Sequence, residues 1–243
     1  MNNQFFPYHI FPLGDAAITI DFGNCIDPAI NKEVIARFNQ LQNNPLPGMI
    51  EAVPAYSSIT VHYDVVALRR MIPAGNTAFE SIKQQLEERV QQSFFQNEIV
   101  ERAVSIPVCY EKEFAPDIVQ LAAAKNITIE ELINIHTSKT YKVYMLGFLP
   151  GFTYMGEVDE RIATPRKPQP VNIAAGSVGI AGKQTGIYPL ASPGGWQIIG
   201  RTAVKLFDAG KEEPTLFRAG DVVQFYSITT KDFYEIQKSP LHL

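Results

Sequence analysis

Hydrophobic positions in the first hundred residues follow two different periods. Short apolar runs over residues 16–22, 49–53 and 58–63 have the length and composition typical of β-strands. Between and after these runs, apolar residues recur every three to four positions, which is the period of one helix face. The chain therefore predicts elements in the order strand, helix, strand, strand, helix.

Both predicted helices begin at recognisable capping residues. Asp27 and Pro28 supply an N-cap and a proline at the first helical position, and Thr77 and Glu80 form a capping box. The first helix is expected to end before Gly48. Its apolar face consists of Ile30, Val34, Phe38 and Leu41, and that of the second helix consists of Phe79, Ile82, Leu86 and Val90. This pattern predicts a small α+β domain whose sheet is covered on one side by two helices.

The pattern changes around residues 95–100, and we place a domain boundary between residues 97 and 98. Residues 100–110 are predicted to form a strand, and short helices are predicted to start at Asp117 and Thr128. Later strand signals are short and separated by tight turns, at residues 141–146, 171–174, 197–199, 203–207 and 222–228. The expected fold is an α+β domain over residues 1–97 followed by a mainly β, closed domain over residues 98–243.

Glycine is concentrated in residues 175–201. The glycines are Gly176, Gly179, Gly182, Gly186, Gly194, Gly195 and Gly200. Such a density predicts tight turns, because glycine adopts backbone conformations that other residues avoid. Free N–H groups in successive turns form a concavity that suits an anion. The alternative is that these glycines serve close corners of a small β-barrel. The spacing alone leaves both interpretations open.

Several familiar motifs are excluded by single residues. Gly182 and Lys183 do not form a phosphate loop, because Ser177 stands at the first glycine and Gln184 at the hydroxyl position. Ser177 is not a nucleophile elbow, since a glycine-rich segment follows it and the only later histidine is His242. The helix after Thr128 has no basic residue to meet DNA phosphates, which argues against a helix-turn-helix.

Composition narrows the class of protein further. A hydrophobic content of 46% is ordinary for a globular chain, and a formal net charge of −4 gives no reason to expect nucleic acid or an anionic membrane as partner. No signal peptide or run of about 18 apolar residues is visible. Cys25 and Cys109 are far apart and lack metal-type spacing. These features predict a cytoplasmic protein with reduced thiols and no protein-bound metal.

A long, ordered series of motifs covers the second half of the chain. It runs through Tyr144–Tyr154, Thr164–Arg166, Gly176–Val178, Gln184–Pro189, Ser192–Trp196 and Gly200–Thr202. This series resembles the family that comprises the B subunit of 5-oxoprolinase, the histidine-kinase inhibitor KipI and allophanate hydrolase subunit 1. The resemblance implies a cyclophilin-like β-barrel as the C-terminal domain. One cation expected from the family is missing near Pro168–Val171, and Lys183 either replaces it or is a solvated side chain.

The resemblance also implies a function and partners. As the B subunit of an ATP-dependent 5-oxoprolinase, the chain would help open 5-oxo-L-proline to L-glutamate. It would be a lactam hydrolase subunit active only in a complex with a subunit-C-like and a subunit-A-like protein, with ATP and Mg²⁺ entering as substrate. Two alternatives stay open at this point. One is a KipI-like inhibitor of a sensor histidine kinase, and the other is subunit 1 of an allophanate hydrolase or urea carboxylase.

Candidate site residues follow from this chemistry. Arg166 and Arg201 are expected to bind phosphate or carboxylate oxygens through paired hydrogen bonds. His136 is either a proton carrier or a histidine that interacts with the carbonyl end of its helix. Substrate or nucleotide contacts are expected from Ser177, Lys183, Gln184, Tyr188, Ser192, Gly194, Gly195 and Trp196, and a partner interface is expected at Phe148, Leu149 and Phe152.

Overall fold

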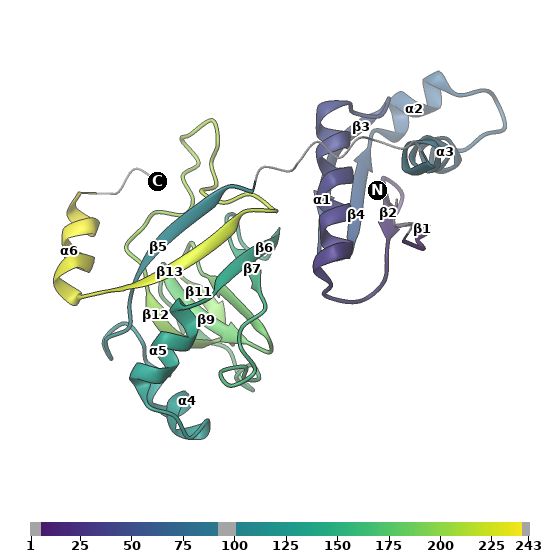
Figure 1. Cartoon of the computed structure of the whole chain (residues 1–243). Helices are drawn as coiled ribbons and strands as arrows, with labels where there is room; N and C mark the ends of the chain where they lie inside the picture. Colours follow the sequence, from purple (N-terminus) through teal and green to yellow (C-terminus); the bar gives the residue numbers. More distant parts are fainter. Residues whose placement is uncertain (1–5, 92–100, 240–243) are drawn as a thin grey trace. The chain divides into compact units, whose positions relative to one another are not determined.

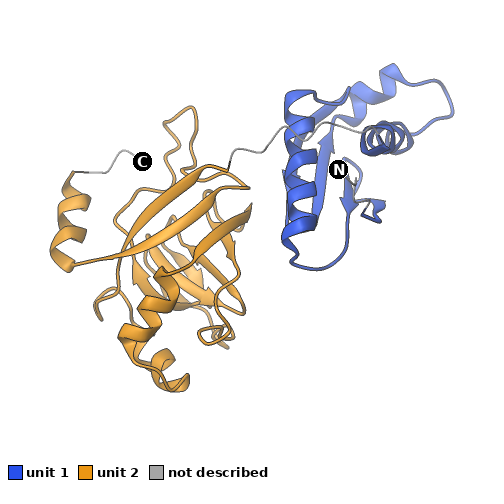
Figure 2. Ribbon diagram, in the orientation of Figure 1, with its two compact units in different colours: residues 1–100 blue, residues 101–243 orange. Residues whose placement is uncertain are grey.

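The computed structural model describes residues 6–91 and 101–239. The chain divides into two compact units, residues 1–100 and 101–243, which are taken separately below (Figure 2). The boundary predicted between residues 97 and 98 lies in residues 92–100, outside the described part. Among the described helices, none is long and apolar enough to span a bilayer.

The first unit contains a four-stranded antiparallel sheet with strand order β1-β2-β4-β3 (Figure 1). The strands are β1 (His9–Pro12), β2 (Ala17–Asp21), β3 (Met49–Pro54) and β4 (Ser58–Tyr63). The three strands predicted from apolar runs are confirmed, whereas β1 was not predicted. Its four residues are mostly exposed, so no buried face marks it in the sequence.

Helices α1 (Pro28–Asn43), α2 (Val65–Met71) and α3 (Ala78–Gln91) complete this unit. The caps of α1 and α3 form as predicted. The Asp27 carboxylate accepts from the backbone of α1, and Thr77 and Glu80 exchange hydrogen bonds at the start of α3. Ile59 and Val61 of β4 share one buried cluster with Val34, Leu41, Ile82 and Leu86 from the two helices. Both helices therefore cover the same face of the sheet, as expected, while α2 is an additional short helix.

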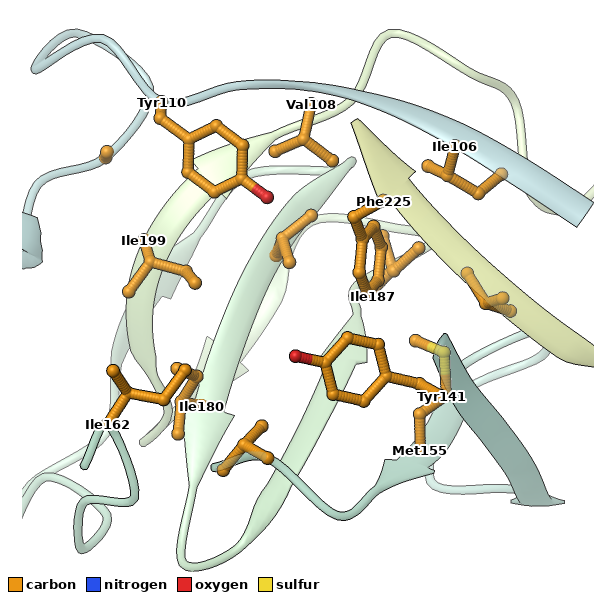
Figure 3. Packing of buried hydrophobic residues seen from close by; sticks show 14 of the residues in the cluster. Ile106, Val108, Tyr110, Tyr141, Met155, Ile162, Ile180, Ile187, Ile199 and Phe225 are labelled. Carbon is orange, nitrogen blue, oxygen red and sulfur yellow. The ribbon is translucent and has the colours of Figure 1, made fainter. Parts of the chain in front are cut away.

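The second unit is a closed barrel with strand order β10-β7-β6-β13-β5-β12-β9. Its strands are β5 (Ala103–Cys109), β6 (Thr140–Leu146), β7 (Thr153–Gly156), β9 (Ser177–Ala181), β10 (Gln184–Ile187), β12 (Gln197–Arg201) and β13 (Val222–Ile228). Only the pairing of β13 with β5 is parallel among these neighbours. Apolar side chains such as Ile106, Ile187 and Phe225 fill the interior (Figure 3).

Shorter elements surround the barrel. Strands β8 (Val171–Ile173) and β11 (Ser192–Gly194) pair in a separate two-stranded sheet. Helices α4 (Ile118–Ala124) and α5 (Ile129–Thr137) begin after Asp117 and Thr128 as predicted, and α6 (Thr230–Lys238) follows β13.

One predicted strand is wrong. Residues 203–207 do not form a strand, and only an isolated bridge joins Phe207 to Thr215. The apolar residues that suggested a strand, Val204 and Leu206, are buried in the barrel core as anchors of a loop. This loop is closed by a backbone bond from the Leu216 N–H to the Leu206 carbonyl.

Candidate functional site

The glycine-rich stretch supplies three strands of the barrel wall. Gly179 of β9 and Gly186 of β10 are direct partners in the ladder. Their neighbours Val178, Ile180 and Ile187 belong to the barrel interior. Because side chains alternate along a strand, both glycines face outward. The sequence interpretation that these glycines serve the barrel is therefore closer to the structure than an anion-binding turn.

These outward glycines make room for aromatic rings. A Cβ added at Gly186 would lie 2.6 Å from the Thr153 carbonyl oxygen, 3.0 Å from the Trp196 ring and 3.2 Å from the Phe152 ring. A Cβ at Gly179 would lie 3.0 Å from Cβ of Trp196. Glycine is needed at Gly186 because two rings and the Thr153 carbonyl pack directly against its backbone, and a side chain at Gly179 would crowd Trp196 and Ile198.

A second hydrophobic cluster covers this part of the outer wall, and we call it the aromatic cluster. It consists of Phe152, Ile173, Ala181, Tyr188, Trp196 and Ile198, with Leu149 and Tyr154 partly buried against it. The Phe152 ring lies at its centre, with centroids 4.8 Å from Tyr154, 4.9 Å from Tyr188 and 5.4 Å from Trp196, each in an edge-to-face arrangement. Such T-shaped packing is the favoured geometry for aromatic pairs.

Tyr188 and Gly194 are fitted to each other. A side chain at Gly194 would collide with the Tyr188 hydroxyl and with Ile173. Burial raises the pKa of Tyr188, while a backbone hydrogen bond from Trp196 and the charge of Arg166 act in the opposite direction. Burial likewise raises the pKa of Tyr154, and Arg166 again opposes it. Both phenols therefore keep their protons at neutral pH.

Arg166 is held at the edge of the aromatic cluster by its own segment. The Lys167 N–H donates to the Gly195 carbonyl at 2.6 Å, and the Gln197 side chain donates to the Pro165 carbonyl at 3.3 Å. A Cβ added at Gly195 would lie 3.7 Å from Nε of Arg166. The segment thus runs along the start of β12 and places the guanidinium beside Gly195 and the two tyrosines.

The arginines of the described barrel unit differ in their partners. Arg102 and Arg218 donate to carboxylates, as does Arg161, and Arg201 donates to a carbonyl. Arg166 is exposed, and within residues 101–239 it has neither an ion pair nor a side-chain hydrogen bond. Its positive charge is available to a ligand.

The neighbouring lysines are neutralised. Lys167 pairs with Asp117 at 2.6 Å, in a largely buried position. Lys183 lies at the β9–β10 turn and pairs with Glu160 at 2.8 Å, with both side chains mostly exposed. A hydrogen bond from Lys183 lowers the pKa of Glu160. Lys183 is therefore a surface cation that is paired with Glu160. That it replaces the cation missing from the family pattern stays a prediction.

Arg201 lies in a different environment. Its Nε donates to the Ala175 carbonyl at 2.7 Å, and its guanidinium carbon lies 5.9 Å from the centre of the Phe233 ring of α6. Ser177 is its direct partner in the β9–β12 ladder and is buried. These contacts hold the turn before β9 against β12. Arg201 and Arg166 therefore lie beside different residues in the structure.

His136 lies inside the barrel and is fully buried. Its Nδ1 lies 2.8 Å from the Tyr110 hydroxyl, and its Nε2 lies 3.0 Å from the Thr185 hydroxyl. Since Thr185 donates its own proton to the Gly179 carbonyl at 3.1 Å, it accepts from Nε2–H, and Nδ1 accepts from Tyr110. Burial lowers the pKa of His136 to about 3. The ring is a neutral hydrogen-bonding link between α5, the segment that follows β5, and β10.

The remaining predicted residues lie around the aromatic cluster. Ser192 begins β11, and its hydroxyl is buried without a hydrogen-bond partner among the described residues. Gln184 begins β10 opposite Gly156 of β7. Phe148 is 62% exposed, whereas Leu149 is half-buried and Phe152 is buried. Of the three predicted interface residues, only Phe148 has a side chain that is mostly exposed to solvent.

Two residues of this region were not chosen from the sequence. Tyr154 of β7 stands two residues after Phe152, which directly precedes the strand, and contributes a second phenol. Asp117 precedes α4, and its carboxylate accepts both from the Ile198 N–H and from Lys167. The alternation in β7 could have identified Tyr154. The role of Asp117 depends on a contact across 81 residues, which no local pattern contains.

Comparison with known proteins identifies relatives over most of the chain. Residues 8–217 match the family described as carboxyltransferase domain, subdomain C and D. The B subunit of 5-oxoprolinase from Bacillus subtilis is 47% identical over 229 residues, covering 93% of this chain and 95% of that protein.

Solved structures agree on the fold. The crystal structure of TTHA0988 matches with a TM-score of 0.74 and 34% identity, over 87% of this chain but only 40% of that longer chain. The Kluyveromyces lactis urea carboxylase matches 95% of this chain and 22% of its own, with a TM-score of 0.72 and 20% identity, which supports the fold alone.

The expected fold class, an α+β first unit followed by a mainly β cyclophilin-like barrel, is confirmed by the closed barrel and by these neighbours. The family resemblance carried by the motifs between Tyr144 and Thr202 is confirmed as well. This chain belongs to the family of carboxyltransferase subdomains C and D and, within it, groups with the B subunits of 5-oxoprolinase.

Proposed function

We propose that this chain is the B subunit of an ATP-dependent 5-oxoprolinase, a lactam hydrolase subunit that is active only in a complex. The reaction opens 5-oxo-L-proline to L-glutamate, with ATP and Mg²⁺ entering as substrate. A subunit-C-like protein and a subunit-A-like protein complete the assembly. The observation that carries the proposal is the 47% identity to the Bacillus subtilis protein of that name over nearly all of both chains.

The chemistry defines what the complex must provide. Transfer of the γ-phosphoryl group of ATP to the lactam oxygen releases ADP and makes the ring carbon more electrophilic, so that water can attack it. Water then attacks the ring carbon, and the carbon–nitrogen bond breaks as the nitrogen takes up a proton, which leaves an acyl phosphate. A second water hydrolyses this acyl phosphate to the carboxylate and releases phosphate. These steps need fixed positive charge near developing anions and a site that excludes bulk water.

This chain offers part of such a site. Arg166 is an available cation beside protonated phenols and a packed aromatic wall. Phe148 projects an exposed apolar ring next to that wall, with its centroid 5.7 Å from Phe152. An exposed aromatic residue of this kind is typical of a surface that a partner covers. We therefore place the contact with the subunit-C-like protein at residues 147–151.

Turnover of the reconstituted proteins tests the proposal. Release of ADP that depends on 5-oxoproline is measured for this chain alone, for a subunit-C homologue alone, and for both with the third subunit. We expect turnover only in the full mixture. Turnover by this chain alone would refute the partner requirement. No turnover despite a stable complex would refute the 5-oxoprolinase assignment and favour a kinase-inhibitor or urea-pathway role.

A further inference from the structure

Arg166 carries a positive charge that no partner neutralises among the described residues, whereas the cations near it are already bound. Lys167, its neighbour in sequence, is paired with Asp117, and Lys183 across the Thr164–Gly182 bridge is paired with Glu160. Arg201 is bound to the Ala175 carbonyl. A ligand group that reaches Arg166 therefore meets a single positive charge. One guanidinium matches one carboxylate, because its two parallel N–H groups fit the two carboxylate oxygens.

The surroundings of Arg166 suit a small flat ring attached to that carboxylate. Tyr154 is half-buried at the edge of the aromatic cluster, whereas Tyr188 is only 1% exposed and its hydroxyl is packed next to Gly194. The exposed Phe148 ring lies edge-on to the Tyr188 ring, with their centroids 6.5 Å apart. Because Tyr188 and the other rings of the cluster are buried, a planar five-membered lactam can pack only against the exposed parts of Phe148 and Tyr154.

We infer that Arg166 binds the carboxylate of 5-oxoproline and that the lactam ring lies against Phe148 and Tyr154 at the exposed edge of the aromatic cluster. This inference rests on the proposed function and assigns the substrate rather than the nucleotide to this chain. A triphosphate carries several negative charges, and sites for it gather several cations or backbone N–H groups. The neighbouring cations are already engaged, so the triphosphate is assigned to the partner's half of the site.

The single tryptophan of the sequence makes this inference directly testable. Trp196 lies in the aromatic cluster, so in the free chain its fluorescence and its indole N–H resonance report on this region alone. The chain, free and in complex with its subunit-C partner, is titrated with 5-oxoproline, with 2-pyrrolidone, which lacks the carboxylate, and with inorganic phosphate. We expect saturable changes with 5-oxoproline and at least tenfold weaker responses to the other two.

Variants then locate the carboxylate contact. In the active complex, Arg166→Gln is expected to raise KM for 5-oxoproline about tenfold to a hundredfold, the effect of losing a charge-assisted hydrogen bond, with KM for ATP unchanged. Arg166→Lys should recover part of this loss. Arg161→Gln is the matched control, because Arg161 is an exposed arginine of the same unit that pairs with Asp159. It should leave both KM values unchanged.

The outcomes separate this inference from the proposed function. If the complex turns over 5-oxoproline and Arg166→Gln leaves its KM unchanged, the carboxylate site is refuted and the function stands. If Arg166→Gln raises KM for ATP instead, Arg166 binds phosphate and the inference is wrong. If turnover is absent but Trp196 still responds to 5-oxoproline and not to 2-pyrrolidone, the carboxylate site stands without the proposed reaction. Without any Trp196 response in chain or complex, the inference fails.

Discussion

His136 shows how one buried side chain links three elements of the barrel. Its two ring nitrogens contact Tyr110 of the segment after β5 and Thr185 of β10, and the Tyr141 hydroxyl of β6 donates to its backbone carbonyl at 2.9 Å. Figure 3 shows the Tyr110 and Tyr141 side chains within the barrel cluster. A protonated imidazole would need an acceptor for a second N–H, and Tyr110 already donates there. The network therefore requires the neutral ring.

This requirement predicts a pH dependence of stability. The ordinary pKa of 6.5 applies to His136 in the unfolded chain, whereas the folded value is about 3. Below pH 6.5 the unfolded chain binds a proton that the folded chain does not, so stability falls as pH decreases from 6.5 toward 3. The contribution is roughly 1.4 kcal/mol per pH unit.

Urea unfolding of wild type and His136→Gln at pH 7, 6, 5 and 4, followed through Trp196 fluorescence, checks this prediction. The variant should be less stable at pH 7 by roughly 1–3 kcal/mol, because buried partners lose a hydrogen bond. The difference should shrink as the pH falls. Parallel pH profiles for the two proteins would contradict a neutral, buried His136.

At the scale of elements, Asp117 joins three separate parts of the second unit. It stands before α4, its carboxylate accepts from the Ile198 N–H of β12 at 2.6 Å, and it pairs with Lys167. Lys167 in turn is bound through its backbone to Gly195. The position of Arg166 therefore depends on an acidic residue that lies far away in the sequence.

We expect Asp117→Ala to destabilise the barrel unit by roughly 1–3 kcal/mol, since it leaves a largely buried lysine and a backbone N–H without their acceptor. Under the proposed function it should also raise KM for 5-oxoproline, because the segment that carries Arg166 loses an anchor. Thermal unfolding followed through Trp196 measures the first effect. Glu160→Ala, which removes the exposed pair with Lys183, is the control and should leave the unfolding midpoint unchanged. Equal effects of the two substitutions would contradict this account.

The sequence predicted those elements whose signals are local. The caps at Asp27, Thr77 and Thr128 and the apolar faces of their helices are enough to identify α1, α3 and α5. Strands β9 and β10 escaped prediction because Gly179 and Gly186 look like turn residues. Their bare backbone is packed against by Trp196 and, at Gly186, also by Phe152, which stand just before β12 and β7.

The predicted site residues have different surroundings in the structure. Gly195 lies beside Arg166, whose charge also acts on Tyr188, and the roles predicted for these residues stay predictions. His136 and Arg201 have different surroundings, because burial and carbonyl contacts engage them elsewhere. A residue type tells what a side chain can bind, but a charge is available only when no neighbour already binds it. That condition depends on ion pairs between distant residues.

At the scale of the whole molecule, the first unit and the barrel each have a hydrophobic core of their own. The proposed activity requires a further protein. Within the barrel unit, the loop at residues 147–151 is the segment that we expect the partner to cover. Phe148 adopts a left-handed backbone conformation with φ of 70°. A bulky residue in this region costs conformational energy, which is consistent with a functional reason for the exposed ring.

Phe148→Gly separates folding from assembly. Glycine adopts a positive φ without strain, so the loss of the exposed ring should change the stability of the isolated chain little. The same substitution should weaken binding to the subunit-C-like protein at least tenfold, because exposed aromatic residues at the centre of interfaces contribute a large share of binding energy. Calorimetric titration of the partner into wild type and variant measures this effect. Val119→Ala, at an exposed apolar position of α4, is the control and should bind as wild type does. Unchanged affinity of Phe148→Gly would place the partner on another surface of the chain, whereas loss of folding would show that Phe148 is needed by the loop itself.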